Sequence, residues 1–356
     1  MEALDLNTLL KGLKHEDETE RIYAAEDLAH LQDDTAIDPL IKQFERDDSI
    51  AVREAINQAL LTFDSPLLVE RVCDWLYSGA AATRNAAVRL LQSKGERNCS
   101  FLESLYSSER DADIRKFIVD AAMMFSPQNC CRFMAMGLED EDINVRIAAV
   151  EYAGQRQLLE LEDHILRLLK AEQEPMLVSS ILESLSNFDS PKAFEAIKAR
   201  FSELREEEGF YLPWIARLYG AHGQEKDLDY LIALLETCPG QVDGVLSEGI
   251  SRLLQRFPDL PLPDCLHPWY EALFEQSLDD CAIDNALDLL VKRSQTPQAR
   301  QLLTGALNSS SSRVRTLATE AIDGSAAKSA LLSELEKRLR IERDPETKEA
   351  LENAIG

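Results

Sequence analysis

The sequence predicts an all-α fold, an α-solenoid (superhelix) of about ten stacked helical hairpins with a half-repeat cap at each end. Three observations predict it. Leu and Ala dominate the composition, while Gly (14) and Pro (13) are scarce, and this balance favours helix over strand. An arginine recurs at near-constant spacing through the first half of the sequence. Apolar residues at helical spacing follow each arginine, and a second amphipathic segment follows them.

The repeated arginine defines the length of the unit. Its positions are separated by 32, 31, 31 and 31 residues, and they are Arg21, Arg53, Arg84, Arg115 and Arg146. Chance rarely gives four such intervals in a row. Alanine pairs recur in the same segments, and small side chains let neighbouring helices approach closely. One helical hairpin cannot bury its apolar face alone, so we expect the units to stack on one another.

Each unit has the same internal plan. An acidic or small polar turn such as residues 47–49 comes first, and its side chains cap the helix that follows. A helix of about 12 residues, a short turn and a second amphipathic helix come next, for example residues 37–46. Pro39, Pro66 and Pro127 lie near the start of second helices, where proline is tolerated.

The later repeats are placed by hydrophobic spacing. Leu177 lies one period after Arg146, and the arginine motif returns at Arg315. If one structural column holds Ile181, Ile215, Ile250 and Leu287, the spacings of 34, 35 and 37 residues imply longer turns. We therefore expect a single solenoid over residues 1–356. Its expected parts are regular repeats in 1–172, degenerate longer repeats in 173–309, and the last repeat with its C-terminal cap in 310–356.

A proline-rich segment interrupts the helical pattern. Phe257–Pro268 contains four prolines in twelve residues, which excludes a continuous helix. We expect an extended loop between the two helices of one repeat. It serves either as a spacer or as an insert that contacts a partner.

Two segments, residues 47–60 and 139–154, resemble HEAT repeats, in particular the short bacterial variety found in phycobilisome lyase subunits. The shared pattern is an acidic residue, then Val or Ile before Arg, then apolar residues with alanines. It matches partly at Arg21 and Arg84 and fails at Leu177. The resemblance implies a ladder of Asp and Arg side chains between neighbouring units; ligand binding is the alternative. The implied ladder residues are Arg53, Arg84, Arg115, Arg146, Arg315, Asp48, Asp113 and Asp142.

The charge of the chain restricts its partners. The 64 Asp and Glu residues against 38 Lys and Arg give a formal net charge of -26. Such a surface repels nucleic-acid phosphates and anionic membranes, so we expect neither as a partner. A basic protein is the natural target, although the charge could also serve solubility alone. An odd number of cysteines (7) without CxxC spacing indicates free thiols and a cytoplasmic location.

Chemistry-bearing motifs are absent from the sequence. The five histidines form no HxxxH or HExxH pair, and no GxxxxGK[ST], GxGxxG or GxSxG is present. These absences argue against a zinc site, a phosphate loop and a nucleophile elbow. We therefore expect a chain that is not an enzyme and that has no cofactor and no metal site.

The function that we expect is that of a non-catalytic protein-binding scaffold or adaptor. Second helices line the concave side of HEAT arrays, so the resemblance implies a contact surface there, near Trp75. Its candidate residues are Asp38, Lys42, Glu70, Arg71, Asp74 and Tyr77. The proline-rich segment is the other candidate. Two alternative functions remain open at this point: a bacterial toxin-neutralising immunity protein, and a bilin lyase or isomerase subunit of the kind that the resemblance suggests.

Overall fold

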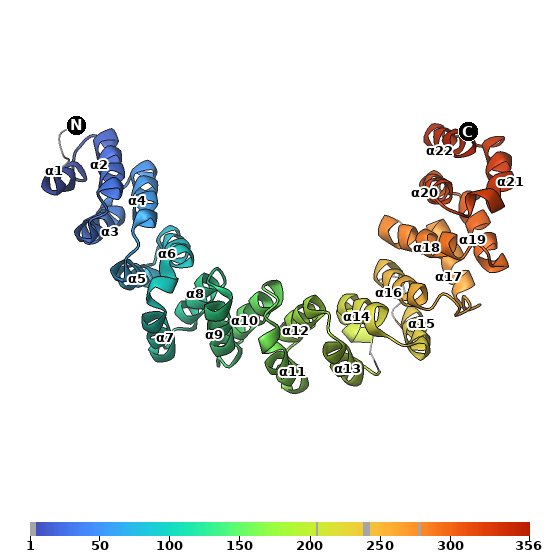
Figure 1. The fold of residues 1–356 in the computed structure, drawn as a ribbon, viewed down its shortest axis with the longest axis horizontal. Helices are drawn as coiled ribbons and strands as arrows, with labels where there is room; N and C mark the ends of the chain where they lie inside the picture. Colours follow the sequence, from blue (N-terminus) through green and yellow to red (C-terminus); the bar gives the residue numbers. More distant parts are fainter. Residues whose placement is uncertain (1–4, 204–205, 238–242, 277–278) are drawn as a thin grey trace. The chain divides into compact units, whose positions relative to one another are not determined.

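The structure, a computed structural model, describes residues 5–203, 206–237, 243–276 and 279–356. Within these ranges the regular elements are helices and no strand is present (Figure 1), so the all-α prediction is confirmed. The chain divides into two compact units, Met1–Phe188 and Asp189–Gly356. The expected single solenoid over the whole chain stays a prediction.

Unit 1 is a run of helical hairpins in which each first helix carries one of the aligned arginines (Figure 1). The cap helix α1 (Leu6–Gly12) precedes them, and α12 (Pro175–Phe188) follows them. The hairpins are α2 (Glu18–Leu31) with α3 (Ile37–Arg46), α4 (Ile50–Thr62) with α5 (Pro66–Cys73), α6 (Ala81–Lys94) with α7 (Cys99–Ser108), α8 (Ala112–Ala122) with α9 (Pro127–Leu138), and α10 (Ile143–Gln155) with α11 (Glu162–Ala171). Short 3-10 turns lie between several successive helices: η1 (Asp34–Ala36), η2 (Asp74–Tyr77), η3 (Gly95–Asn98) and η4 (Leu159–Leu161).

Unit 2 continues the same plan with the longer turns that the spacings predict. It begins with α13 (Pro191–Arg200) and ends with α22 (Pro345–Ile355), which lies within residues 310–356, where the last repeat and its C-terminal cap are expected. Between them lie η5 (Glu206–Tyr211), α14 (Leu212–His222), η6 (Glu225–Asp227), α15 (Leu228–Thr237), α16 (Asp243–Arg256), α17 (Leu266–Gln276), α18 (Asp280–Lys292), α19 (Pro297–Leu307), α20 (Ser312–Asp323) and α21 (Lys328–Leu339).

Polar side chains in the turns fix where the first helices begin. Asp17, Ser49, Asp111 and Asp142 each accept a hydrogen bond from a backbone amide in the first turn of the following helix. These bonds satisfy amides that have no partner inside the helix. The acidic turns of the sequence therefore act as helix caps.

First helices pack on the first helices of neighbouring hairpins, as α2 does on α4 and α10 does on α12. Small residues make this possible. Ala25 and Ala149 are fully buried, and a Cβ atom added at Gly154 would lie 2.6 Å from the Cα atom of Ser184 in α12. A backbone approach this close admits only glycine at position 154.

The proline-rich loop lies between α16 and α17, as the prolines predict, but it ends at residue 265 because Leu266, His267 and Pro268 already form the first turn of α17. Arg293 in the turn after α18 anchors it. The Nη2 atom of Arg293 donates to the carbonyl oxygens of Leu254 (2.6 Å) and Phe257 (2.9 Å). The loop is thus tied to the next hairpin of its own unit.

Candidate functional site

A buried arginine joins neighbouring hairpins of unit 1. The Nε and Nη2 atoms of Arg115 donate to the carboxylate of Asp140 at 2.8 and 2.7 Å. Its Nη1 atom donates to the carbonyl oxygens of Glu109 (3.2 Å) and Arg110 (3.1 Å) in the turn before α8. The two side chains are 6% and 3% exposed. One guanidinium therefore holds its own turn and the carboxylate that opens the next repeat.

The same arrangement, which we call a rung, recurs along the chain. Arg21 donates to Asp47 at 2.7 and 3.0 Å. In unit 2, Arg315 donates to Glu342 at 2.8 Å through both Nε and Nη2. Arg146 forms a looser rung, with its Nη2 atom 3.6 Å from Glu172. In each of these pairs the acidic residue follows the arginine by 25 to 27 residues in the sequence.

The rung carboxylates differ from the acidic residues that the resemblance implies. Asp48 and Asp113 are exposed. Asp142 caps α10 by accepting from the amides of Asn144 (2.8 Å) and Val145 (3.3 Å). The arginines contact Asp47, Asp140, Glu172 and Glu342 instead. Where the capping residue is Ser49, Asp142 or Asp344, the acceptor lies two residues before it. An acidic run in the sequence does not reveal which of its carboxylates contacts the arginine.

At the Arg84 rung, the carboxylate accepts a hydrogen bond from a tyrosine and not from the arginine. Arg84 donates to the carbonyl oxygen of Ser78 at 2.6 Å. The rung acid Glu109 accepts instead from the hydroxyl of Tyr77 and from the backbone amides of Arg110 and Asp111. The phenol of Tyr77, expected to be a contact residue, therefore joins η2 to the turn that precedes α8.

At Arg53 the rung has no carboxylate. Ser78 stands where Asp47 and Asp140 stand at other rungs, and its hydroxyl accepts the amide of Ala80 at 3.3 Å. The Arg53 guanidinium lies 4.7 Å from the centroid of the Phe44 ring, and its Nη2 atom is 3.4 Å from the hydroxyl of Thr83. Its Nε atom is buried and has no hydrogen-bond partner among the described residues. Such an atom costs about 1–3 kcal/mol.

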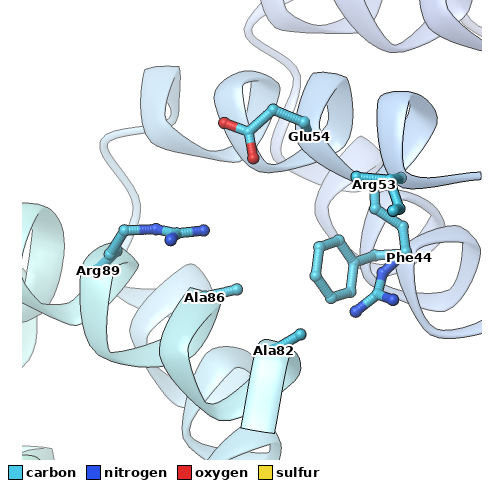
Figure 2. A pocket seen from close by; sticks show the side chains of 7 residues that line it. Phe44, Arg53, Glu54, Ala82, Ala86 and Arg89 are labelled. Carbon is cyan, nitrogen blue, oxygen red and sulfur yellow. The ribbon is translucent and has the colours of Figure 1, made fainter. Parts of the chain in front are cut away.

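Arg53 lies between two pockets. The first, with a volume of about 280 Å³, lies between α4 and α6, and we call it the α4–α6 pocket (Figure 2). It is lined by Phe44, Ile50, Arg53, Glu54, Ala82, Ala86 and Arg89. The second has a volume of about 420 Å³ and is lined by Phe44, Glu45, Arg53, Asp74, Trp75, Tyr77, Ser78, Ala80 and Thr83. The missing rung therefore coincides with open space on both sides of an arginine.

Two of the expected contact residues, Asp74 and Tyr77, line the second pocket. Asp38 and Arg71 form an exposed ion pair with atoms 2.8 Å apart.

The other two expected contact residues differ in their surroundings: Lys42 is exposed, while Glu70 accepts from the side-chain amide of Asn98 at 3.0 Å. Trp75 is a core residue that is 2% exposed and stacks on Phe44 with ring centroids 4.3 Å apart. Sequence reasoning missed Arg53 and Arg89 as pocket residues, because the gap at Arg53 depends on the distant Ser78.

The rungs also affect the response to acid. Burial alone would raise the pKa of Asp140, but hydrogen bonds from Arg115, from Tyr106 and from the amide of Asp142 outweigh it and lower that pKa. The pKa of Glu342 is lowered far below its usual range, chiefly by hydrogen bonding to Arg315 and against the effect of burial. The unfolded chain then binds more protons than the folded chain below the ordinary carboxyl pKa of about 4. The stability that the rungs provide is present above that pH and is lost as the pH falls through the lowered values.

We therefore expect Asp140→Asn to reduce the free energy of unfolding by roughly 1.5–3 kcal/mol at neutral pH. The difference from the wild type should shrink as the pH falls below about 4. Urea unfolding of both proteins at a series of pH values measures it. A difference that stays constant with pH would contradict the pairing of Asp140 with Arg115.

The described residues contain no group of three or more His, Cys, Asp or Glu side chains that could hold a metal ion. In the same part of the chain, no helix has both the length and the apolar character needed to cross a membrane. The site chemistry that the structure does offer is charge pairing and apolar packing around Arg53.

Comparisons with known proteins agree with this architecture. Residues 6–92 match the family model of HEAT repeats. The crystal structure of Kap121p matches 98% of this chain and 45% of its own, with a TM-score of 0.54 and 14% identity. The structure of Kap121p bound to Nup53p matches 99% of this chain and 49% of its own, with a TM-score of 0.51 and 14% identity.

The karyopherin Kap121p bound to the extreme C-terminus of the protein phosphatase Cdc14p matches 99% of this chain and 50% of its own, with a TM-score of 0.50 and 14% identity. The chain thus spans about half the length of these structures, and the likeness shows the fold.

No curated protein sequence matches the chain, so the narrower resemblance to phycobilisome lyase subunits stays a prediction. The HEAT-repeat match begins in α1 and ends in α6, and it includes α4 and most of α6, the helices on either side of the gap at Arg53. Beyond it, the arginine rungs repeat the same construction at Arg115, Arg146 and Arg315. Residues 6–92 of the chain therefore consist of HEAT repeats.

Proposed function

We propose that the chain is a non-catalytic protein-binding scaffold whose acidic surface binds a basic protein partner in the cytoplasm. The observation that carries this proposal is the location of the positive charge. Arg21, Arg115 and Arg315 are each paired with a carboxylate inside a rung. Each such pair is neutral, so the net charge of -26 lies on the remaining side chains. A basic partner is attracted by that field.

Stacked hairpins provide the extended surface that such binding needs. The solved structures of similar fold include Kap121p bound to Nup53p and Kap121p bound to the C-terminus of Cdc14p. Protein binding is thus a use to which this fold is put elsewhere, and it supports the scaffold proposal. The exposed Asp74 beside the second pocket is a surface carboxylate that a basic partner could contact.

Affinity capture from the source organism at low and at high salt tests the proposal. We expect the captured proteins to be basic and to be lost at high salt, with association slowed about tenfold or more as ionic strength rises. Asp74→Lys should weaken capture more than Glu349→Lys, an equal charge reversal at an exposed position on α22. Capture that is indifferent to salt, or restricted to acidic proteins, would refute the proposed electrostatic binding.

A further inference from the structure

The gap at Arg53 leaves a guanidinium without its usual acceptor. At three rungs the arginine Nε atom donates to a carboxylate: Arg21 to Asp47, Arg115 to Asp140, and Arg315 to Glu342. At the gap, the hydroxyl of Ser78 accepts a hydrogen bond from the backbone amide of Ala80, as the carboxylate of Asp47 does from the amide of Ser49. It supplies no charge. Arg53 lies over the Phe44 ring instead, with its Nε atom unpaired.

The α4–α6 pocket adds space and a second positive charge. Figure 2 shows the Arg89 side chain reaching from α6 toward the pocket, while Arg53 and Phe44 lie on its other side. Arg89 is exposed and forms no ion pair with any described residue. Glu54 is the acidic residue of the lining, so the pocket carries one net positive charge in a chain of net charge -26.

The second pocket differs in its charge. It shares Arg53 with the first pocket but also contains Glu45 and Asp74. One oxygen of Glu45 accepts from the indole nitrogen of Trp75 at 2.9 Å. Its two carboxylates repel an anion, so the α4–α6 pocket is the favourable side for one to approach Arg53. Ile50, which is 83% exposed, forms an apolar part of that pocket's lining.

We propose that the α4–α6 pocket binds an acidic side chain of a partner protein, whose carboxylate pairs with Arg53 and Arg89. The incoming carboxylate approaches the Arg53 guanidinium from the side of the α4–α6 pocket, whereas Ser78 lines the second pocket. Ile50, Phe44 and the alanines of α6 then receive an apolar residue next to it in the partner. This inference rests on the protein-binding function proposed above, and it names the chemistry that one pocket recognises within an otherwise acidic surface.

The first test supplies the missing carboxylate by a substitution in the protein itself. Ser78→Asp places a carboxylate at the rung position, whereas Ser78→Asn adds the same bulk without charge. We expect S78D to melt about 2–4 °C above S78N, a shift typical of one further charge-assisted pair in a domain of this size. Equal melting temperatures would show that a carboxylate there does not reach Arg53, and they would overturn the assignment of the gap.

The second test uses a defined probe, the peptide acetyl-Leu-Glu-Leu-amide, and its neutral counterpart acetyl-Leu-Gln-Leu-amide. Protein labelled with isotopic arginine shows the Nε–H resonance of Arg53 by NMR, and Arg53→Lys assigns it. We expect the glutamate peptide to shift this resonance with a Kd on the order of 1 mM. The glutamine peptide should not shift it, and S78D should abolish the response.

An equal response to both peptides, or none to either, would overturn the pocket's assignment to a carboxylate. A response to the glutamate peptide that persists in S78D would overturn it as well, because the carboxylate would then be recognised elsewhere. Salt-dependent capture of basic proteins is measured independently of these peptides. Its failure with a positive peptide result would therefore remove only the basic-partner proposal.

Discussion

Arg115→Met is expected to lower the free energy of unfolding by about 3–5 kcal/mol. The substitution leaves the carboxylate of Asp140 buried, with 3% of its side chain exposed and no cation beside it. The hydroxyl of Tyr106 and the amide of Asp142 still donate to Asp140, but neither carries a compensating charge. Urea unfolding at neutral pH measures the loss.

The control for Arg115 is Arg167→Met, which removes an exposed arginine from α11 and should change stability by less than about 0.5 kcal/mol. Arg115→Met combined with Asp140→Leu removes both charges and should recover most of the loss. If Arg115→Met unfolds at the same urea concentration as Arg167→Met, the rung does not stabilise the fold.

Trp75→Ala is the second change with a large expected effect, a loss of about 3–5 kcal/mol. The indole is 2% exposed, stacks on Phe44 at 4.3 Å, and donates to Glu45 at 2.9 Å. Its removal leaves a void between α3 and η2 and takes the hydrogen-bond donor from Glu45. Unfolding followed by circular dichroism measures the loss, since the change removes a fluorophore.

Trp269→Ala is the matched control for Trp75. Trp269 lies in α17 and is only half-buried, so its removal opens a smaller void and should cost less. Equal losses for the two tryptophans would contradict the central packing role of Trp75. The comparison also separates burial from residue type, because the same side chain is deleted in both variants.

The helical pattern could be predicted because it depends on local, repeated signals. The 31-residue spacing of the arginines and the capping residues of the turns locate the first helices of unit 1. Helix α22 lies within the segment 310–356, where the C-terminal cap is expected, and Asp344 and Pro345 mark its start. The prolines of the segment after α16 likewise predict the loop that the structure shows.

The gap at Arg53 could not be predicted, because it depends on a residue in the next repeat. Val52-Arg53 is a good match to the repeat pattern, yet its rung lacks a carboxylate. The decisive residue is Ser78, 25 positions further along, in a turn whose local sequence shows only a capping hydroxyl. To predict such a pair, one must know which side chain of a turn points toward the arginine of the preceding repeat, and the periodicity of the sequence does not contain that information.

Because the two partners of a rung lie in successive hairpins, the rungs affect which duplications and deletions of repeats the protein tolerates. Each complete rung joins an arginine of one hairpin to an acid just before the next hairpin, as Arg115 does with Asp140. A duplication or deletion whose boundary separates these partners strands a buried charge. The junction of Arg53 with Ser78 contains no such pair, so recombination there exchanges whole repeats without leaving an ion unmatched.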